Sequence, residues 1–92
     1  MEEVKSKRIM AIEYLRIVVT PLCVHPEQIV IEDILDERGL VLNLKANKED
    51  LPFLIGRGGK IADALRSVLH IWGTRNIASV KLFVNRREEN GQ

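Results

Sequence analysis

Three glycines and two cations lie within the five consecutive residues from Gly56 to Lys60. Glycine has no Cβ and tolerates positive φ, so the turn from Gly56 to Gly59 can bend sharply and let the backbone of another molecule approach closely. Arg57 and Lys60 add positive charge at the same place. The chemistry that these residue types allow is the binding of an anion, and a phosphate group is the natural ligand.

An amphipathic helix is predicted directly after the glycines. Its apolar residues recur at three- and four-residue spacing. They are Ile61, Ala62, Leu65, Val68, Leu69 and Trp72. The unpaired N–H groups of its first turn and the positive end of its dipole would then face the glycine loop. The loop and the helix together therefore predict a local anion site.

Two familiar phosphate-binding loops do not fit this segment. A Walker A loop needs a glycine five positions before Gly59 and a Ser or Thr after Lys60, and Leu54 and Ile61 stand there instead. The dinucleotide fingerprint needs Gly-x-Gly-x-x-Gly immediately after a strand, but residues 51–55 are typical of a short helix. The remaining arrangement is helix, Gly-x-x-Gly, helix, which the KH module uses to clamp a short run of single-stranded nucleic acid.

The segment Ile55–Arg66 resembles the KH core signature in its bacterial, type II form. The order of predicted elements resembles the small one-domain KH proteins of bacteria, the KhpA-like RNA-binding proteins. Even His25-Pro26-Glu27, before the first predicted strand, is similar to the Asn-Pro-Asp/Glu found there. The resemblance covers roughly Val4 to Val84, with Pro52 a mild departure that bears on the length of the helix before the loop.

The resemblance implies an α+β, type II KH domain over residues 1–84. Its three-stranded mixed sheet would pack against three helices in the order α-β-β-α-GxxG-α-β, with the strands joined through the helix pair running parallel. The ligand implied is single-stranded RNA, of which such a domain holds about four nucleotides. The expected RNA-binding residues are Ile55, Gly56, Arg57, Gly58, Gly59, Lys60, Ile61 and Arg66.

Each of these residues has an expected role. The glycines let the sugar-phosphate backbone approach, Arg57 and Lys60 neutralise phosphates, and Ile55 and Ile61 contribute to an apolar groove for the bases. Arg66 and Arg75 are either RNA contacts or solvated surface charges. Trp72 continues the apolar stripe and is expected in the core rather than stacked on a base. With four aromatic residues and no aromatic platform on a strand, weak discrimination between bases is expected.

The first half of the chain predicts one helix and a hairpin. Apolar residues from Ala11 to Leu22 form a helical stripe with Pro21 in its tail. Either the helix stops near Thr20 or its last turn is kinked and continues to Leu22, and the second is favoured because Leu22 keeps the period. Residues 28–35 predict a strand with a bulge near Glu32-Asp33, residues 36–39 a turn, and residues 40–44 a second strand with a buried leucine face. Either Asn47 or Asp50 caps a short helix before the loop.

The second half ends in a third strand. Gly73 is expected to stop the helix after the loop, and residues 77–84 predict a strand with Val80, Leu82 and Val84 facing one way. Residues 85–92 are polar and are expected to form a disordered tail.

Composition limits the function classes. Ninety-two residues, 46% of them hydrophobic, predict one domain with a modest core. The single cysteine cannot form an internal disulfide, which favours a reducing compartment. The sequence shows no apolar signal segment or membrane span, so the cytoplasm is the expected location. A formal net charge of +1 indicates that any nucleic-acid contact is local.

No cofactor, metal or catalytic role is expected. Cys23 and His25 are only two candidate ligands, and no nucleophile lies at a usable spacing from a base. The expected function is that of an RNA chaperone or post-transcriptional regulator. The alternatives are a protein-interaction or assembly scaffold, with a KhpB-like second KH protein or a second copy as partner, and a ribosome-assembly factor.

Overall fold

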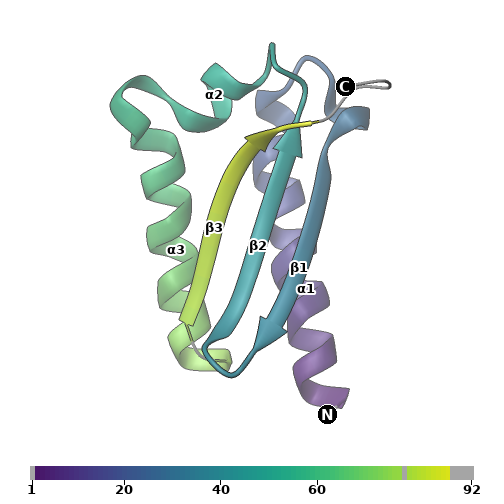
Figure 1. Ribbon diagram of the computed structural model, residues 1–92, viewed down its shortest axis with the longest axis vertical. Coiled ribbons are helices and arrows are strands. Elements are labelled where there is room, and N and C mark those ends of the chain that lie inside the picture. The colour runs from purple at the N-terminus through teal and green to yellow at the C-terminus, as the bar shows by residue number, and fades with distance from the viewer. Residues whose placement is uncertain (1, 78, 88–92) are drawn as a thin grey trace.

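Three strands form one mixed sheet, and the two long helices cover one of its faces (Figure 1). The computed structural model describes residues 2–77 and 79–87. Its main elements are α1 (Glu2–Val19), β1 (Val30–Asp36), β2 (Gly39–Ala46), α2 (Leu51–Ile55), α3 (Lys60–Asn76) and β3 (Ser79–Arg86). Short 3-10 helices lie at Thr20–Leu22, Pro26–Gln28 and Arg57–Gly59. The predicted order of elements is confirmed.

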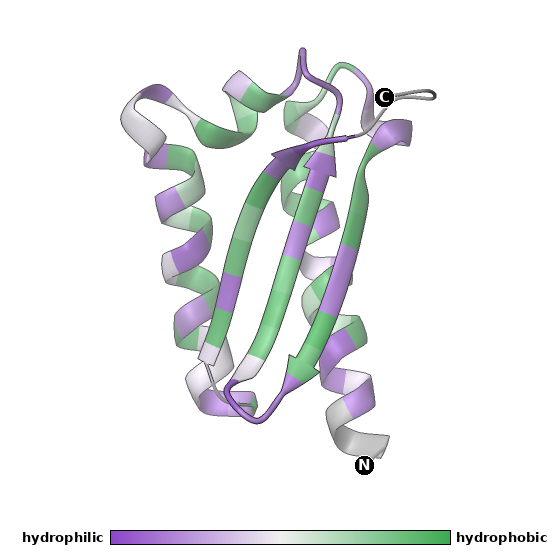
Figure 2. Cartoon of the chain, viewed as in Figure 1, coloured by the Kyte–Doolittle hydropathy of each residue, from purple (hydrophilic) through white to green (hydrophobic). Residues whose placement is uncertain are grey.

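Strand β2 is the centre of the sheet. It pairs antiparallel with β1 and parallel with β3, as the KH resemblance implies. Figure 2 shows apolar and polar residues alternating along the strands. The apolar side faces the helices, and its central row, Leu40, Leu42, Leu44 and Ala46, is buried. The buried leucine face is therefore confirmed, and it forms the middle of the core with Leu15 of α1 and Leu69 of α3.

The bulge predicted in the first strand is wrong. The pairing of β1 with β2 runs without interruption from Val30 opposite Lys45 to Asp36 opposite Gly39. Asp33 stands on the helix-facing side of this edge strand, where its Oδ2 lies 2.6 Å from Nη2 of Arg8 in α1. Ile34 faces outward and is 61% exposed. The hydrophobic alternation breaks because an ion pair holds a carboxylate on the inner face, not because the strand bends.

Helix α1 is longer at its start than the apolar stripe indicates. It begins at Glu2, and Ala11, Leu15 and Val19 are buried against the sheet. The chain does continue past Pro21, but as a 3-10 turn that ends at Leu22. Leu22 is 41% exposed, so its expected place in the buried stripe is wrong. The tighter turn rotates this residue away from the core.

The end of α3 also differs from the prediction. The helix runs through Gly73 to Asn76, and the amide of Ile77 donates to the carbonyl oxygen of Gly73 at 2.8 Å. Gly73 is buried inside the helix rather than standing at its C-terminal cap. A glycine inside a helix near its end has the same sequence signature as a helix stop.

Strand β3 extends beyond the predicted boundary. Val80 and Leu82 are buried and Val84 packs against the core, as expected. The strand reaches Arg86, the Asn85 side-chain amide donates to Asn43 Oδ1 at 2.7 Å, and the amide of Arg87 donates to the Ala46 carbonyl. The predicted disorder is therefore wrong for residues 85–87, while residues 88–92 lie outside the described part of the chain.

Asp50 occupies the cap position of α2 but does not cap it with its side chain. Its carboxylate is buried and accepts hydrogen bonds from the amides of Val24, at 2.6 Å, and His25, at 2.9 Å. The carboxylate thus joins the start of α2 to the segment between α1 and β1. Within residues 2–77 and 79–87, no helix is long and apolar enough to cross a membrane.

Candidate nucleic-acid interface

Helix α2 ends in a bend that only glycine accommodates well. Gly56 has φ 81° and ψ 169°, a region that is essentially restricted to glycine, and Gly58 and Gly59 are left-handed with φ 65° and 79°. The amide of Gly59 donates to the carbonyl oxygen of Gly56 at 3.0 Å, which closes the turn. The sequence predicts this bend correctly, and all three of its glycines have positive φ.

The open side of the bend lies at Gly58 and Gly59. A Cβ added to either residue would meet no atom within 4 Å outside its chain neighbours, so another molecule can approach the backbone there. Gly59 is also the cap residue of α3 and has no side chain with which to cap the first turn. The first-turn amides of α3 therefore point toward an accessible surface, where a phosphate oxygen can accept from them.

Arg57 and Lys60 supply positive charge around this surface. Both side chains are exposed, and neither makes an ion pair or hydrogen bond with the residues that the structure describes. The acidic residue of the first turn, Asp63, is paired with Arg66, whose Nη1 lies 3.1 Å from its Oδ1. The pair offsets the one negative charge that would repel a phosphate at this helix end.

The two isoleucines beside the loop differ in position. Ile55, the last residue of α2, is 37% exposed and can touch a ligand. Ile61 is half-buried and packs beneath the bend, because a Cβ on Gly56 would lie 2.7 Å from its Cγ1. Ile61 therefore supports the loop from inside. Its contribution to an apolar groove for the bases stays a prediction.

Arg66 lies away from the loop, along the junction of α3 with β3. Its Nε donates to the carbonyl oxygen of Leu82 at 3.0 Å, so part of the guanidinium is used within the chain. The same arginine lines a hollow of about 230 Å³ with Val80, Lys81, Leu82 and Phe83. The structure thus brings Arg57 and Lys60 together at the loop and places Arg66 beside the edge strand.

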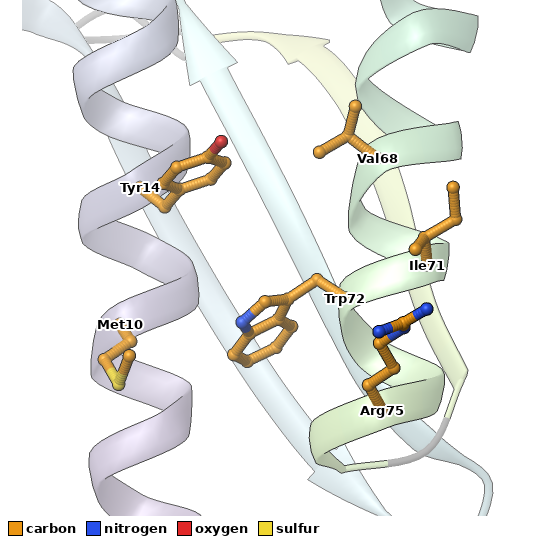
Figure 3. A pocket seen from close by; sticks show the side chains of 6 residues that line it. All are labelled: Met10, Tyr14, Val68, Ile71, Trp72 and Arg75. Atoms are coloured by element: carbon orange, nitrogen blue, oxygen red, sulfur yellow. The ribbon is translucent and has the colours of Figure 1, made fainter.

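A larger apolar groove runs between α1 and α3 on the side away from the sheet (Figure 3). Its volume is about 550 Å³, and it is lined by Met10, Tyr14, Val68, Ile71, Trp72 and Arg75. Trp72 is half-buried and packs on the core, which agrees with its predicted role, but one side of it also forms the groove. Val68 and Ile71 indicate this surface in the sequence, because they widen the apolar stripe of α3 beyond its sheet-facing side.

Cys23 and His25 have ordinary structural surroundings. Burial raises the pKa of the Cys23 thiol, and the Asp50 carboxylate raises it further. The protonated thiol that this favours is a poor metal ligand. His25 Nε2 lies 3.1 Å from Glu49 Oε1. Among the residues with described positions, no three His, Cys, Asp or Glu side chains group as a metal site.

Comparison with known proteins places the loop in a family context. A family model described as KhpA/KhpB, KH domain, matches residues 12–84. The chain is 34% identical over 67 residues to RNA-binding protein KhpA of Listeria monocytogenes serovar 1/2a, covering 73% of this chain and 88% of that protein. It is 40% identical over 75 residues to RNA-binding protein KhpA of Lactiplantibacillus plantarum, covering 82% and 84%. No solved structure matches the chain significantly.

Proposed function

The chain belongs to the KhpA/KhpB family of KH domains, and from this premise we propose that it binds single-stranded RNA at the loop Gly56–Gly59. The proposed role is that of a cytoplasmic RNA chaperone or post-transcriptional regulator, with binding rather than catalysis as its activity. The relatives named above are RNA-binding proteins, which supports the class of ligand. A short bound stretch of about four nucleotides is typical of a KH domain.

The observation that carries the proposal is the state of the two loop cations. Arg57 and Lys60 are exposed and unpaired within the described residues, on either side of a backbone that a ligand can approach. Two free cations and a helix N-terminus favour the binding of two or three consecutive phosphates. Ile55 would then contact the first base beside the loop. Contacts of this kind fix the backbone and read little sequence.

The proposal is tested by changing the loop charge while keeping its shape. In the variant Arg57→Asp/Gly58→Asp, one carboxylate replaces the Arg57 cation and a second is added at Gly58, where the space is open. A Cβ at Gly58 meets no atom, and aspartate is among the residues that best tolerate left-handed φ, so the fold should persist. We expect affinity for a labelled U4 oligonucleotide to fall at least tenfold, measured by fluorescence anisotropy at two salt concentrations.

The matched control is Arg57→Asn/Gly58→Asn, which has nearly the same shape without negative charge. It should lose less affinity than the aspartate variant, and its salt dependence should be shallower than that of the wild type, because each phosphate contact contributes about 0.7 to the slope for a single strand. Equal affinity of all three proteins for RNA, with unchanged circular dichroism, would refute the loop as the site.

The groove between α1 and α3 favours a second function, assembly with another KH domain. Met10, Tyr14 and Ile71 are each more than half exposed in it, and exposed apolar patches of this kind mark protein interfaces. The partner is either a KhpB-like protein or a second copy of this chain. Because the groove does not include the loop, assembly and RNA binding are compatible. A role in ribosome assembly would use the same two surfaces.

A further inference from the structure

The outer face of the sheet, opposite the helices, carries an exposed aromatic ring. Alternation along β3 directs Val80 and Leu82 inward and Lys81, Phe83 and Asn85 outward. Phe83 is 49% exposed in the middle of the strand. The sequence contains the signal for this, because an odd-numbered phenylalanine between buried even-numbered residues must face outward. The expectation that the strands carry no aromatic surface for bases is therefore incomplete.

Polar groups suited to bases surround this ring. Asn43 of β2 is directly opposite Phe83 in the parallel pairing, and Asn85 donates one amide hydrogen to Asn43 Oδ1 at 2.7 Å. The Nδ2 group of Asn43 and the Oδ1 of Asn85 take no part in that bond and are available to a base edge. The acidic residue of the same cross-strand row, Glu32, has its Oε1 3.0 Å from Lys45 Nζ. Its charge is thus offset.

The edge of this face meets α3, the helix that begins at the proposed loop site. Phe83 shares its hollow with Arg66, which hydrogen-bonds to the β3 backbone, and with Lys81, which makes no ion pair with the described residues. Arg66 is six residues beyond Lys60 on α3, about 9 Å along the helix axis. Cations thus lie at the loop (Arg57 and Lys60), farther along α3 (Arg66) and on β3 (Lys81).

From this arrangement we infer that a single-stranded RNA longer than the loop can hold continues across the edge of the sheet and stacks one base on Phe83. Lys81 and Arg66 contact its phosphates there, and Asn43 and Asn85 face the edge of the stacked base. Base stacking on an aromatic side chain tolerates any sequence. The inference rests on the proposed function, and it adds a stacking subsite to the loop.

The experiment compares U4, which the loop holds, with U8, which reaches the strand. We expect Phe83→Ala to weaken U8 binding about tenfold, within the range for one stacked base, and to leave U4 binding unchanged. Phe83→Tyr should keep the wild-type affinity. Phe83→Leu should lose it, because leucine keeps the apolar bulk without the ring. Ile34→Ala is the matched control, an exposed apolar residue on the same face but on the far strand, and should change nothing.

A second series uses U8 oligonucleotides that each lack one base. One abasic position should weaken binding to the wild type and not to Phe83→Ala, which identifies the stacked base. Wild-type U8 affinity in Phe83→Ala, or in Phe83→Leu, overturns the inference. A change in molar mass by light scattering at unchanged U8 affinity also overturns it, since the face would then contact protein.

The two proposals fail separately. If the loop variant Arg57→Asp/Gly58→Asp loses binding while Phe83→Ala does not, the loop site stands and the stacking subsite is wrong. If Phe83→Ala weakens U8 binding and the loop variant binds normally, the subsite stands and the loop site is wrong. A wild type that binds neither oligonucleotide refutes both.

Discussion

Gly56 and Gly58 both have positive φ, but different constraints act on them. At Gly56 a Cβ would lie 2.8 Å from the backbone nitrogen of Ile61, and the backbone is in a region that other residues rarely enter. At Gly58 the space is open and only the left-handed φ of 65° opposes a side chain. Gly56 is therefore constrained by its packing on Ile61 as well as by its backbone conformation, whereas Gly58 is constrained by its backbone conformation alone.

We expect Gly56→Ala to lower the free energy of unfolding by about 3 kcal/mol, because strain and steric overlap add, and Gly58→Ala to lower it by about 1 kcal/mol. For a domain of this size 1 kcal/mol corresponds to roughly 4–8 °C in Tm. Thermal unfolding followed by circular dichroism measures both. Equal losses of stability in the two variants would contradict the different surroundings described for them.

At the residue scale the sequence predicted the loop charges better than the other contacts. Arg57 and Lys60 follow from local spacing alone, since loop and helix start are adjacent in the chain. The engagement of Arg66 with Leu82 and the position of Phe83 depend on how α3 packs against β3, which local spacing does not contain. The proposed roles of these residues in RNA binding remain predictions.

Among the elements, α2 depends most on a single buried group. The Asp50 carboxylate accepts two backbone hydrogen bonds from Val24 and His25, so the connection after α1 and the helix before the loop share one anchor. We expect Asp50→Ala to lower the free energy of unfolding by about 2–4 kcal/mol, because two partly buried amide donors lose their partner and the buried space of the carboxylate is emptied. Chemical denaturation with urea gives this value directly.

The adjacent residue offers the control. Glu49 is largely exposed and pairs with His25 at the surface, so Glu49→Gln should change stability by no more than about 0.5 kcal/mol. The loss of stability in Asp50→Asn should lie between those of Asp50→Ala and Glu49→Gln, because the side-chain amide keeps one oxygen as an acceptor. If Asp50→Ala were as stable as the wild type, the carboxylate would not be the anchor.

The elements that the sequence did not predict share a physical cause. The apparent bulge in β1 is an ion pair between Asp33 and Arg8, and the apparent helix stop at Gly73 is a buried position in α3. The first depends on a partner from another element and the second on burial in the folded chain, neither of which a local pattern contains. By contrast, the hairpin, the short α2 and the glycine bend follow from patterns within single segments, and the structure confirms them.

The whole molecule presents two surfaces of different chemistry. The loop and the edge of β3 carry cations, whereas the groove between α1 and α3 is apolar and lined by α-helical side chains. The proposed RNA site and the proposed protein interface would thus lie on different surfaces of one small domain. This division would allow a chain with little net charge to have a local basic site for RNA.

Charge placed in the groove should separate the two activities. We expect Ile71→Lys, at a residue 58% exposed, to leave the fold intact and to weaken association with a second copy by about 2 kcal/mol, the scale of an interface hot spot. Light scattering after size exclusion should show the shift toward monomer, while U4 affinity stays unchanged. His70→Lys, on the outer side of the same helix, is the control.

A wild type that is monomeric at every concentration would exclude a second copy as the partner. If the wild type associates and Ile71→Lys has the same molar mass, the contact lies elsewhere on the molecule.

The most direct measurement of the central claim is a titration of the ¹⁵N-labelled protein with U4, followed by amide chemical shifts. The structure predicts that the largest shifts fall on the amides of Gly56 to Ile61, with smaller shifts along the first turns of α3. Shifts confined to the groove lined by Tyr14 and Ile71, with the glycine loop unperturbed at saturating RNA, would contradict the account.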